Sequence, residues 1–206
     1  MLARAYRRLQ QFLFPITGGI SATSVEAIVS GASQLTVKLA DWDRDSGAGS
    51  MWDLLAVSLI ARYRNPRVCF EIGTGHGRTT HHLALNTPSG TQIFSLDISH
   101  EPCIGSIFRD QATSKKIVRL TGDSTSFDFG QWVGQVDFLF VDGDHSYDAV
   151  FRDTEHALAM VAPGGCILWD DFTPTWPEVV KALKHHPRRT DFRRISGTKI
   201  VYYGQG

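Results

Sequence analysis

Apolar runs of strand length alternate with longer amphipathic segments through the greater part of the chain. Five of these runs, at 67–72, 92–98, 116–120, 136–141 and 165–169, are predicted to be strands. Strands that alternate with helix-length segments are typical of a parallel sheet covered by helices on both faces. The pattern therefore predicts a Rossmann-like, doubly wound α/β fold.

Two of the predicted helices have clear sequence signals. Between the last two strands, Tyr147 to Val161 place their apolar side chains on one helical face, and Pro163 follows. Ahead of the first strand, Ser50 and Asp53 resemble a capping box that opens a second amphipathic helix. We expect both helices to pack on the sheet.

The tail of the chain has a different pattern, with β-type runs at 191–196 and 199–203 separated only by Gly197 and Thr198. This spacing predicts a hairpin, which adds one antiparallel strand to the sheet. We therefore expect a seven-stranded, mostly parallel sheet with a C-terminal antiparallel hairpin strand. Residues 50–206 would form this domain, and residues 1–49 an N-terminal helix and a loop-rich lead-in.

The N-terminal segment is basic, with Arg4, Arg7 and Arg8 and no acidic residue before Glu26. We expect an amphipathic helix that docks on the fold or on a second subunit. In the second case this segment would make the protein a homo-oligomer. A transit peptide and a helix that seeks a membrane surface are the alternatives.

Composition excludes several classes of protein. The 206 residues carry 21 Lys+Arg and 21 Asp+Glu, so no long-range field attracts nucleic acid, and we expect no such partner. With 42% hydrophobic residues the chain has ample material for one folded core. Its apolar stretches are shorter than the roughly 18 residues of a membrane-spanning helix, so no membrane span is expected.

Two further features of the composition bear on location and partners. The three cysteines are widely spaced and form no CxxC pair, which favours a reducing, cytoplasmic compartment over a disulfide framework or a zinc site. The stretch 181–199 holds seven Lys or Arg, and we interpret it as a solvated basic face rather than an RNA-binding strip.

A glycine-rich loop follows the first predicted strand, with Gly73, Gly75 and Gly77 at alternate positions. Glycines allow a sharp turn and close approach of the backbone to a ligand, and the next helix offers its N–H groups. A dinucleotide fingerprint needs its third glycine where Arg78 stands. The loop therefore favours an adenosine cofactor other than NAD, or it is merely a structural turn.

From this loop onward the chain resembles the class I S-adenosylmethionine-dependent methyltransferases, over about residues 50–205. The resemblance makes Glu71 the acid before the glycine loop, Asp97 the ribose ligand at the end of the second strand, and Asp123 the acid that faces the adenine. Individually, Asp97 and Asp123 could each be a helix cap or a turn residue. The full set of cofactor contacts that the resemblance implies is Glu71, Gly73, Thr74, Gly75, Gly77, Asp97, Gly122, Asp123, Ser124 and Asp142.

Carboxylates end two neighbouring strands of the predicted sheet, Asp142 after the fourth and Asp170 and Asp171 after the fifth. The carboxyl ends of adjacent parallel strands share one crevice, so these side chains should meet. Clustered carboxylates repel unless they are neutralised, and a hard divalent cation does this, which predicts Mg²⁺. The alternative is that all three residues are caps and turns.

The same residues carry a closer resemblance, to metal-dependent O-methyltransferases of the catechol type and of the macrolide-sugar and cephalosporin-tailoring type. These enzymes place one Asp after strand four and an acidic pair after strand five. The pair Asp170 and Asp171 departs from the Asp-Asn and Glu-Asp pairs of the two types. His145 stands three residues beyond Asp142, where the catechol type has its catalytic lysine and the sugar type a histidine, so it becomes the expected general base.

The leading hypothesis is an S-adenosylmethionine-dependent O-methyltransferase in natural-product tailoring, which methylates a small-molecule hydroxyl with Mg²⁺ and His145 as base. A metal-independent methyltransferase that acts on another acceptor is the first alternative. A non-catalytic subunit that binds an adenosyl ligand is the second, because fold alone does not establish chemistry. An NAD-linked oxidoreductase is disfavoured by Arg78.

Overall fold

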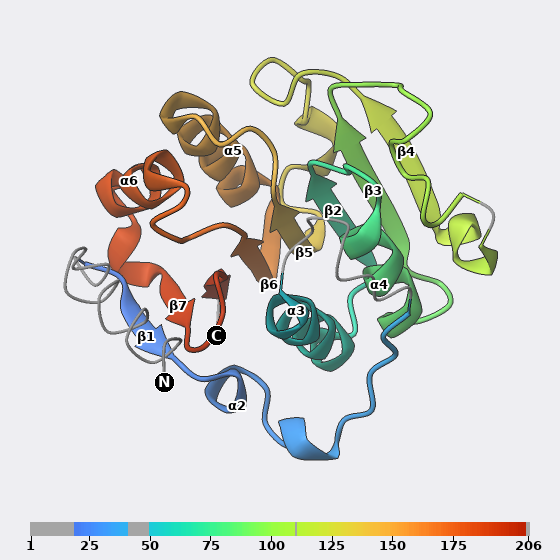
Figure 1. Cartoon of the computed structure of the whole chain (residues 1–206), viewed down its shortest axis with the longest axis horizontal. Coiled ribbons are helices and arrows are strands. Elements are labelled where there is room, and N and C mark those ends of the chain that lie inside the picture. Colours follow the sequence, from blue (N-terminus) through green and yellow to red (C-terminus); the bar gives the residue numbers. More distant parts are fainter. Residues whose placement is uncertain (1–18, 41–49, 110, 205–206) are drawn as a thin grey trace.

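The computed structural model describes residues 19–40, 50–109 and 111–204. Within them an eight-stranded sheet runs in the order β1-β7-β8-β6-β5-β2-β3-β4 (Figure 1). The predicted N-terminal helix lies outside the described residues. The strands are β1 (Ser21–Thr23), β2 (Val68–Ile72), β3 (Gln92–Asp97), β4 (Ile117–Thr121), β5 (Val136–Val141), β6 (Val161–Trp169), β7 (Arg193–Ile195) and β8 (Val201–Gly204).

The central strands β4, β3, β2, β5 and β6 are all parallel, and β8 runs antiparallel to both β6 and β7. Alternate residues of these strands point to opposite faces. Phe70 and Leu139 enter one apolar cluster, while Cys69 and Phe138 enter the other. A sheet buried on both faces explains the continuous apolar runs, and the predicted α/β fold is confirmed.

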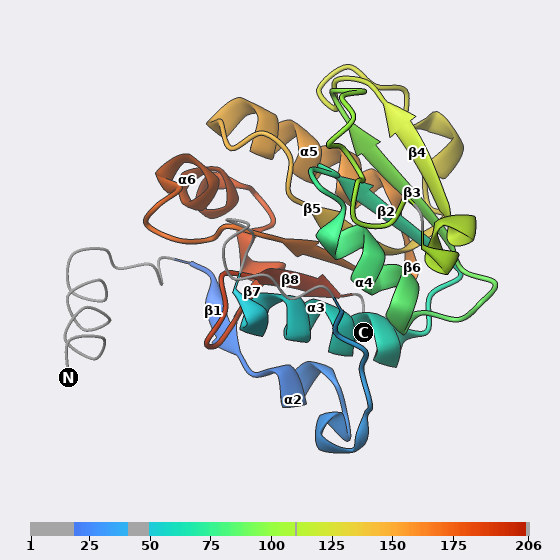
Figure 2. The same cartoon turned by 45° about the vertical axis from the view of Figure 1, so that its right-hand side comes forward.

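Helices cover both faces of this sheet (Figure 2). On one face, residues of α5 (Tyr147–Met160) and α6 (Pro177–His185) complete the first apolar cluster. On the other, α3 (Met51–Arg64) and α4 (Arg78–Asn86) contribute to the second, beside the short α2 (Val25–Ile28). Four 3₁₀ helices are also described: Ala32–Gln34, Ala112–Lys116, Gly130–Trp132 and Arg189–Asp191.

The lead-in adds an eighth strand that the sequence pattern did not predict. Ser21–Thr23 pairs in parallel with β7, so part of the segment assigned to a separate lead-in belongs to the sheet of the domain. With only three residues and a burial pattern that leaves two of them exposed, β1 has too little apolar content to stand out.

The C-terminal hairpin forms as predicted, but its strands are shorter. Lys199, predicted to begin the last strand, lies in the turn, where Thr198 Oγ1 accepts from the Ile200 amide and donates to the Ile195 carbonyl. The amide of Lys199 donates instead to Asp53 Oδ1, at 2.8 Å. A helix-capping carboxylate therefore keeps this residue out of the strand.

None of the helices in the described ranges is both long and apolar enough to cross a membrane.

Candidate active site

A cavity of about 810 Å³ opens at the carboxyl ends of β2, β5 and β6. Eight of the residues predicted for the site line it: Glu71, Gly73, Thr74, Gly75, Asp142, His145, Asp170 and Asp171. The other predicted residues do not line it: Gly77, Asp97, Gly122, Asp123 and Ser124. The structure therefore brings these eight predicted residues together at one cavity and places the other five around it.

Gly73 is the tightest point of the glycine loop. Its φ is +93°, and a Cβ atom there would lie 1.9 Å from the carbonyl oxygen of Asp142. Backbone hydrogen bonds from Gly73 N to Leu96 O and from Asp142 N to Ile72 O, both 2.8 Å, hold the loop across the ends of the strands. Only glycine fits this crossing, so the loop leaves its backbone open to the cavity.

Asp97 braces the glycine loop from the end of β3. Its Oδ2 accepts hydrogen bonds from the amides of Thr74, at 3.1 Å, and Gly75, at 2.9 Å. Its Oδ1 accepts from Ser99 N, at 3.0 Å. A carboxylate that accepts several amides is well suited to fixing a turn, so Asp97 has a structural role whether or not it also binds a ribose.

The segment after β3 lies against the glycine loop. Gly105 N donates to Gly75 O, at 2.8 Å, and Ile107 N donates to His76 O, at 3.1 Å. Ile107 lines the cavity, although it carries no signal that sequence analysis could use. Asp123 lies outside the cavity, where its exposed carboxylate accepts from the amide and hydroxyl of Thr125. The predicted adenine contact of Asp123 therefore stays a prediction.

Glu71 is buried beneath the loop, with 1% of its surface exposed. The hydroxyls of Thr80 and Ser95 both donate to its Oε2. Burial raises the pKa of Glu71 to about 7, against the hydrogen bonds from Ser95 and Thr80, which lower it. A carboxyl group with such a pKa is largely protonated in mildly acidic solution.

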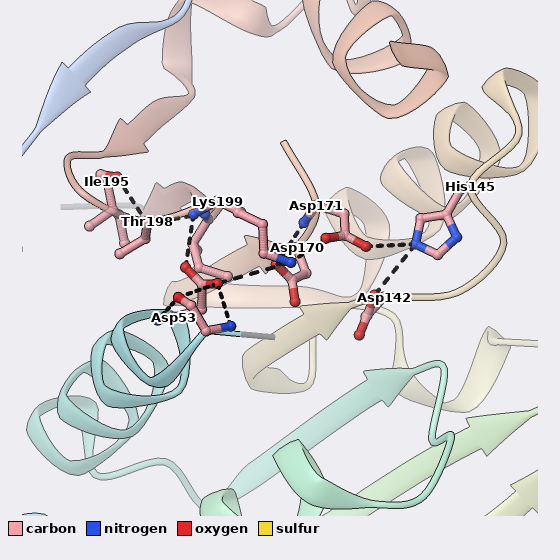
Figure 3. A network of polar contacts seen from close by, with 10 residues as sticks. Asp53, Asp142, His145, Asp170, Asp171, Ile195, Thr198 and Lys199 are labelled. Atoms are coloured by element: carbon pink, nitrogen blue, oxygen red, sulfur yellow. Dashed lines mark hydrogen bonds and ion pairs between the residues drawn. The ribbon is translucent and has the colours of Figure 1, made fainter. Parts of the chain in front are cut away.

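Asp142, Asp170 and Asp171 converge at the cavity, as their strand ends predict (Figure 3). Burial, followed by the charges of Asp170 and Asp171, raises the pKa of Asp142 well above its usual range. Asp171 has a left-handed backbone, with φ of 59°, and its amide donates to Asp170 Oδ1 at 2.6 Å. Such a conformation is uncommon outside glycine and is often found at functional sites.

Lys199 enters the same cluster, a position that its sequence context did not predict. Its ammonium donates to Asp171 Oδ1 and lies 3.5 Å from Asp170 Oδ1 and 4.0 Å from Asp53 Oδ2. Burial opposes the charged form, but the neighbouring carboxylates outweigh it and raise the pKa of Lys199. One member of the supposed solvated basic face therefore points into the cavity.

Asp53 ties Lys199 to the start of α3. Its Oδ2 accepts from the Ser50 amide and hydroxyl, at 3.1 and 2.8 Å, which confirms the predicted capping box. Its Oδ1 accepts from the Lys199 amide. The helix cap and the hairpin turn thus share one buried carboxylate.

His145 reaches the cluster from the segment before α5. Its Nε2 lies 3.0 Å from Asp171 Oδ2 and 3.8 Å from Asp142 Oδ1. Burial opposes ionisation of Asp171, but hydrogen bonds from His145 and Lys199 lower its pKa. Candidate ligand atoms of Asp142, His145 and Asp171 all lie within 4.8 Å of one another. This set replaces Asp170 of the predicted metal site with His145.

Several solved structures have a fold similar to that of this chain. The O-methyltransferase TomG from Streptomyces achromogenes, involved in tomaymycin synthesis and solved in complex with SAM, has a TM-score of 0.60 and 18% identity, over 89% of this chain and 100% of that one. CalS11, a TDP-rhamnose 3'-O-methyltransferase in calicheamicin biosynthesis, has a TM-score of 0.59 and 18% identity, over 76% and 80%. The O-methyltransferase from Bacillus cereus in complex with SAH has a TM-score of 0.57 and 17% identity, over 96% and 97%.

These identities are too low to carry more than the fold. None of the curated proteins compared with the chain matches it in sequence. A family profile described as a methyltransferase domain does match, over residues 70–172, which is half of the chain and runs from β2 to the acidic pair after β6. With its glycine loop, its strand order and its acidic strand ends, this chain belongs to the methyltransferase domain family.

Proposed function

We propose that this protein transfers the methyl group of S-adenosylmethionine to a hydroxyl group of a small molecule. The observation that carries the proposal is one cavity with the open glycine loop on one side and the pair of His145 and Asp171 on the other. Its volume of about 810 Å³ is within the usual range of ligand sites, roughly 300 to 1,000 Å³.

The glycine loop fits S-adenosylmethionine in its chemistry. The backbones of Gly73, Thr74 and Gly75 line the cavity without bulky side chains, and Arg78 stands where a dinucleotide loop needs a glycine. Asp97 would act on the cofactor mainly by fixing the amides of this loop. When bound, the cofactor supplies an electrophilic methyl group on its sulfonium.

His145 is the proposed general base. With Nε2–H donating to Asp171 Oδ2, a neutral imidazole keeps its lone pair on Nδ1, which is the atom that would take the hydroxyl proton. Asp171 would orient the ring and stabilise the imidazolium that results. Because the carboxylate is itself fixed by Lys199, the imidazole is held in one orientation before an acceptor arrives.

Mg²⁺ on Asp142, Asp170 and Asp171 stays a prediction from the sequence, and these three side chains do not fit it as they are arranged. Both members of the acidic pair already contact the ammonium of Lys199. The alternative set of Asp142, His145 and Asp171 would occupy the proposed base with a metal bond. We therefore propose that the methyl transfer does not require a metal ion.

The class of methyl acceptor is inferred from the similar enzymes and not from this cavity alone. TomG and CalS11 belong to tomaymycin and calicheamicin biosynthesis, so a hydroxyl on a natural-product precursor is the proposed acceptor.

The test is a transfer assay with methyl-labelled S-adenosylmethionine and matched phenols, anilines and nucleotide sugars. Labelled methyl ethers from the hydroxyl acceptors, without labelled amines, are the expected result. Cofactor binding without transfer to any acceptor would instead favour a non-catalytic adenosyl-binding subunit.

A further inference from the structure

Four carboxylates converge at one end of the cavity, and the ammonium of Lys199 lies close to three of them. Asp53, Asp170 and Asp171 each have an oxygen within 4.0 Å of Lys199 Nζ, and Asp142 lies beyond them beside His145 (Figure 3). Carboxylates packed this closely need a compensating positive charge. In metal-dependent enzymes a divalent ion supplies that charge.

Lys199 is built into the cluster and is not a mobile surface lysine. Its amide is bonded to Asp53 at 2.8 Å, and Thr198 closes the turn on both sides through Ile195 and Ile200. Its side chain keeps only 31% of its surface exposed, between the acidic pair and the start of α3. The backbone of Lys199 is therefore held by the hairpin turn, and its ammonium is held by the surrounding carboxylates.

The contacts of Lys199 occupy oxygen atoms that a metal would need. Asp171 gives Oδ1 to Lys199 and Oδ2 to His145, and Asp170 gives Oδ1 both to Lys199 and to the amide of Asp171. A divalent ion held by the acidic pair would also stand close to the ammonium, and two cations at such a distance repel.

We propose that Lys199 is the resident cation of this site, taking the place that a divalent metal would fill and holding Asp171 in position for His145. Lys199 is thus a positioning residue that acts through Asp171. That Lys199 takes the place of a metal is inferred from the charges of this chain alone, whereas its role in positioning His145 rests on the proposed methyl transfer.

The first experiment measures metal binding by the full-length protein without cofactor or acceptor. Mn²⁺ titration, followed by electron paramagnetic resonance and calorimetry, is applied to the wild type, Lys199→Ala and Lys199→Gln. Removing the ammonium should raise the affinity for one Mn²⁺ by on the order of tenfold or more, because a like charge leaves the site. Adding Asp170→Asn to Lys199→Ala should abolish that gain.

Lys199→Arg and Lys181→Ala are the matched controls. The first keeps a positive charge at residue 199, and the second removes an exposed lysine of the same basic stretch that pairs with Glu178. Both should bind Mn²⁺ as weakly as the wild type. The proposal is overturned if the wild type already binds Mn²⁺ as tightly as Lys199→Ala, or if neither Lys199→Ala nor Lys199→Gln gains any binding.

The second experiment tests positioning through catalysis. Wild-type turnover should survive chelation, and Lys199→Ala should lose roughly 10²-fold in kcat, the scale for removing one preorganised charge. Added Mn²⁺ should restore much of that loss in the variant but not change the wild type, which a purely structural role would not produce. If no acceptor is methylated at all, the proposed function fails while the Mn²⁺ titration still decides the role of Lys199.

Discussion

The rings of His145 and Trp176 stack with their centroids 4.0 Å apart and an interplanar angle of 13°. Trp176 immediately precedes α6 and is linked back to Asp171 by two short turns, from Thr173 N to Asp171 O at 2.7 Å and from Trp176 N to Thr173 O at 2.9 Å. One segment thus supplies the carboxylate at the edge of the imidazole and the indole on its face. The orientation of His145 is set by residues 171–176.

Replacing Trp176 with Ala should lower kcat by about 3- to 10-fold, because an aromatic pair is worth roughly 0.5 to 1.5 kcal/mol beyond its area. Trp176→Phe should keep most of the activity, since it preserves a ring over the imidazole. Steady-state kinetics of both variants checks this. Trp52, which is 63% exposed and does not line the cavity, provides the control variant Trp52→Ala. A Trp176→Ala enzyme with wild-type kcat would show that the stack does not position the base.

His145→Ala should lower turnover by about 10² to 10⁴, the usual contribution of a positioned base, with nearly unchanged affinity for S-adenosylmethionine. Wild-type activity should fall at low pH, where a protonated imidazole can no longer accept a proton. Profiles of kcat against pH for the two proteins measure both effects. A small loss with the same acidic limb in the variant would leave His145 a packing residue and assign deprotonation to another group.

Gly73 and Gly75 of the glycine loop should respond differently to alanine. At Gly73 the added Cβ would meet the Asp142 carbonyl at 1.9 Å, whereas at Gly75 nothing lies within 4 Å. Gly73→Ala should lower the free energy of unfolding by about 3 kcal/mol or more, and Gly75→Ala by about 1 kcal/mol, the strain of a left-handed alanine. Chemical denaturation measures both. Equal losses in the two variants would mean that Gly73 does not lie against the Asp142 carbonyl as described.

The buried Glu71 should make stability depend on pH. Its pKa is raised from 4.5 to about 7, so its contribution to stability is complete below about pH 4.5 and is lost as the pH rises through 7. Glu71→Gln cannot ionise, so its stability relative to the wild type should improve by roughly 3 kcal/mol between pH 5 and pH 8. Denaturation at both pH values measures the difference, with the exposed Glu178→Gln as control. A constant difference across this range would contradict the raised pKa.

The fold and most of the cavity could be predicted because both depend on local pattern. Apolar runs define the parallel strands, and residues that follow adjacent strands, such as Asp142 and Asp170, meet by the topology of the sheet alone. The same topology accounts for Lys199, since Trp169 pairs with Val201 and the residues just before β8 must lie beside those just after β6. The basic neighbours of Lys199 in the sequence obscure that relationship.

Other features depend on contacts between distant parts of the chain. That Lys199 lies in the turn follows from the capture of its amide by Asp53, 146 residues earlier. The short strand β1 forms because β7 offers an unpaired edge, which the composition of residues 21–23 does not reveal. Likewise, the bracing of the glycine loop by Asp97 requires the two segments to be seen together.

Calorimetric titration of the wild-type protein with S-adenosylmethionine and, separately, with NAD tests the proposed methyl-donor site most directly. S-adenosylmethionine should bind saturably at one site per chain, and NAD should show no measurable binding. Asp97→Ala should weaken the binding of S-adenosylmethionine by about 1 to 3 kcal/mol, the cost of leaving the loop amides without their charged acceptor, and Asp128→Ala, an exposed turn residue outside the cavity, should not. Binding of NAD in preference to S-adenosylmethionine, or affinity that Asp97→Ala leaves unchanged, would contradict the proposed site.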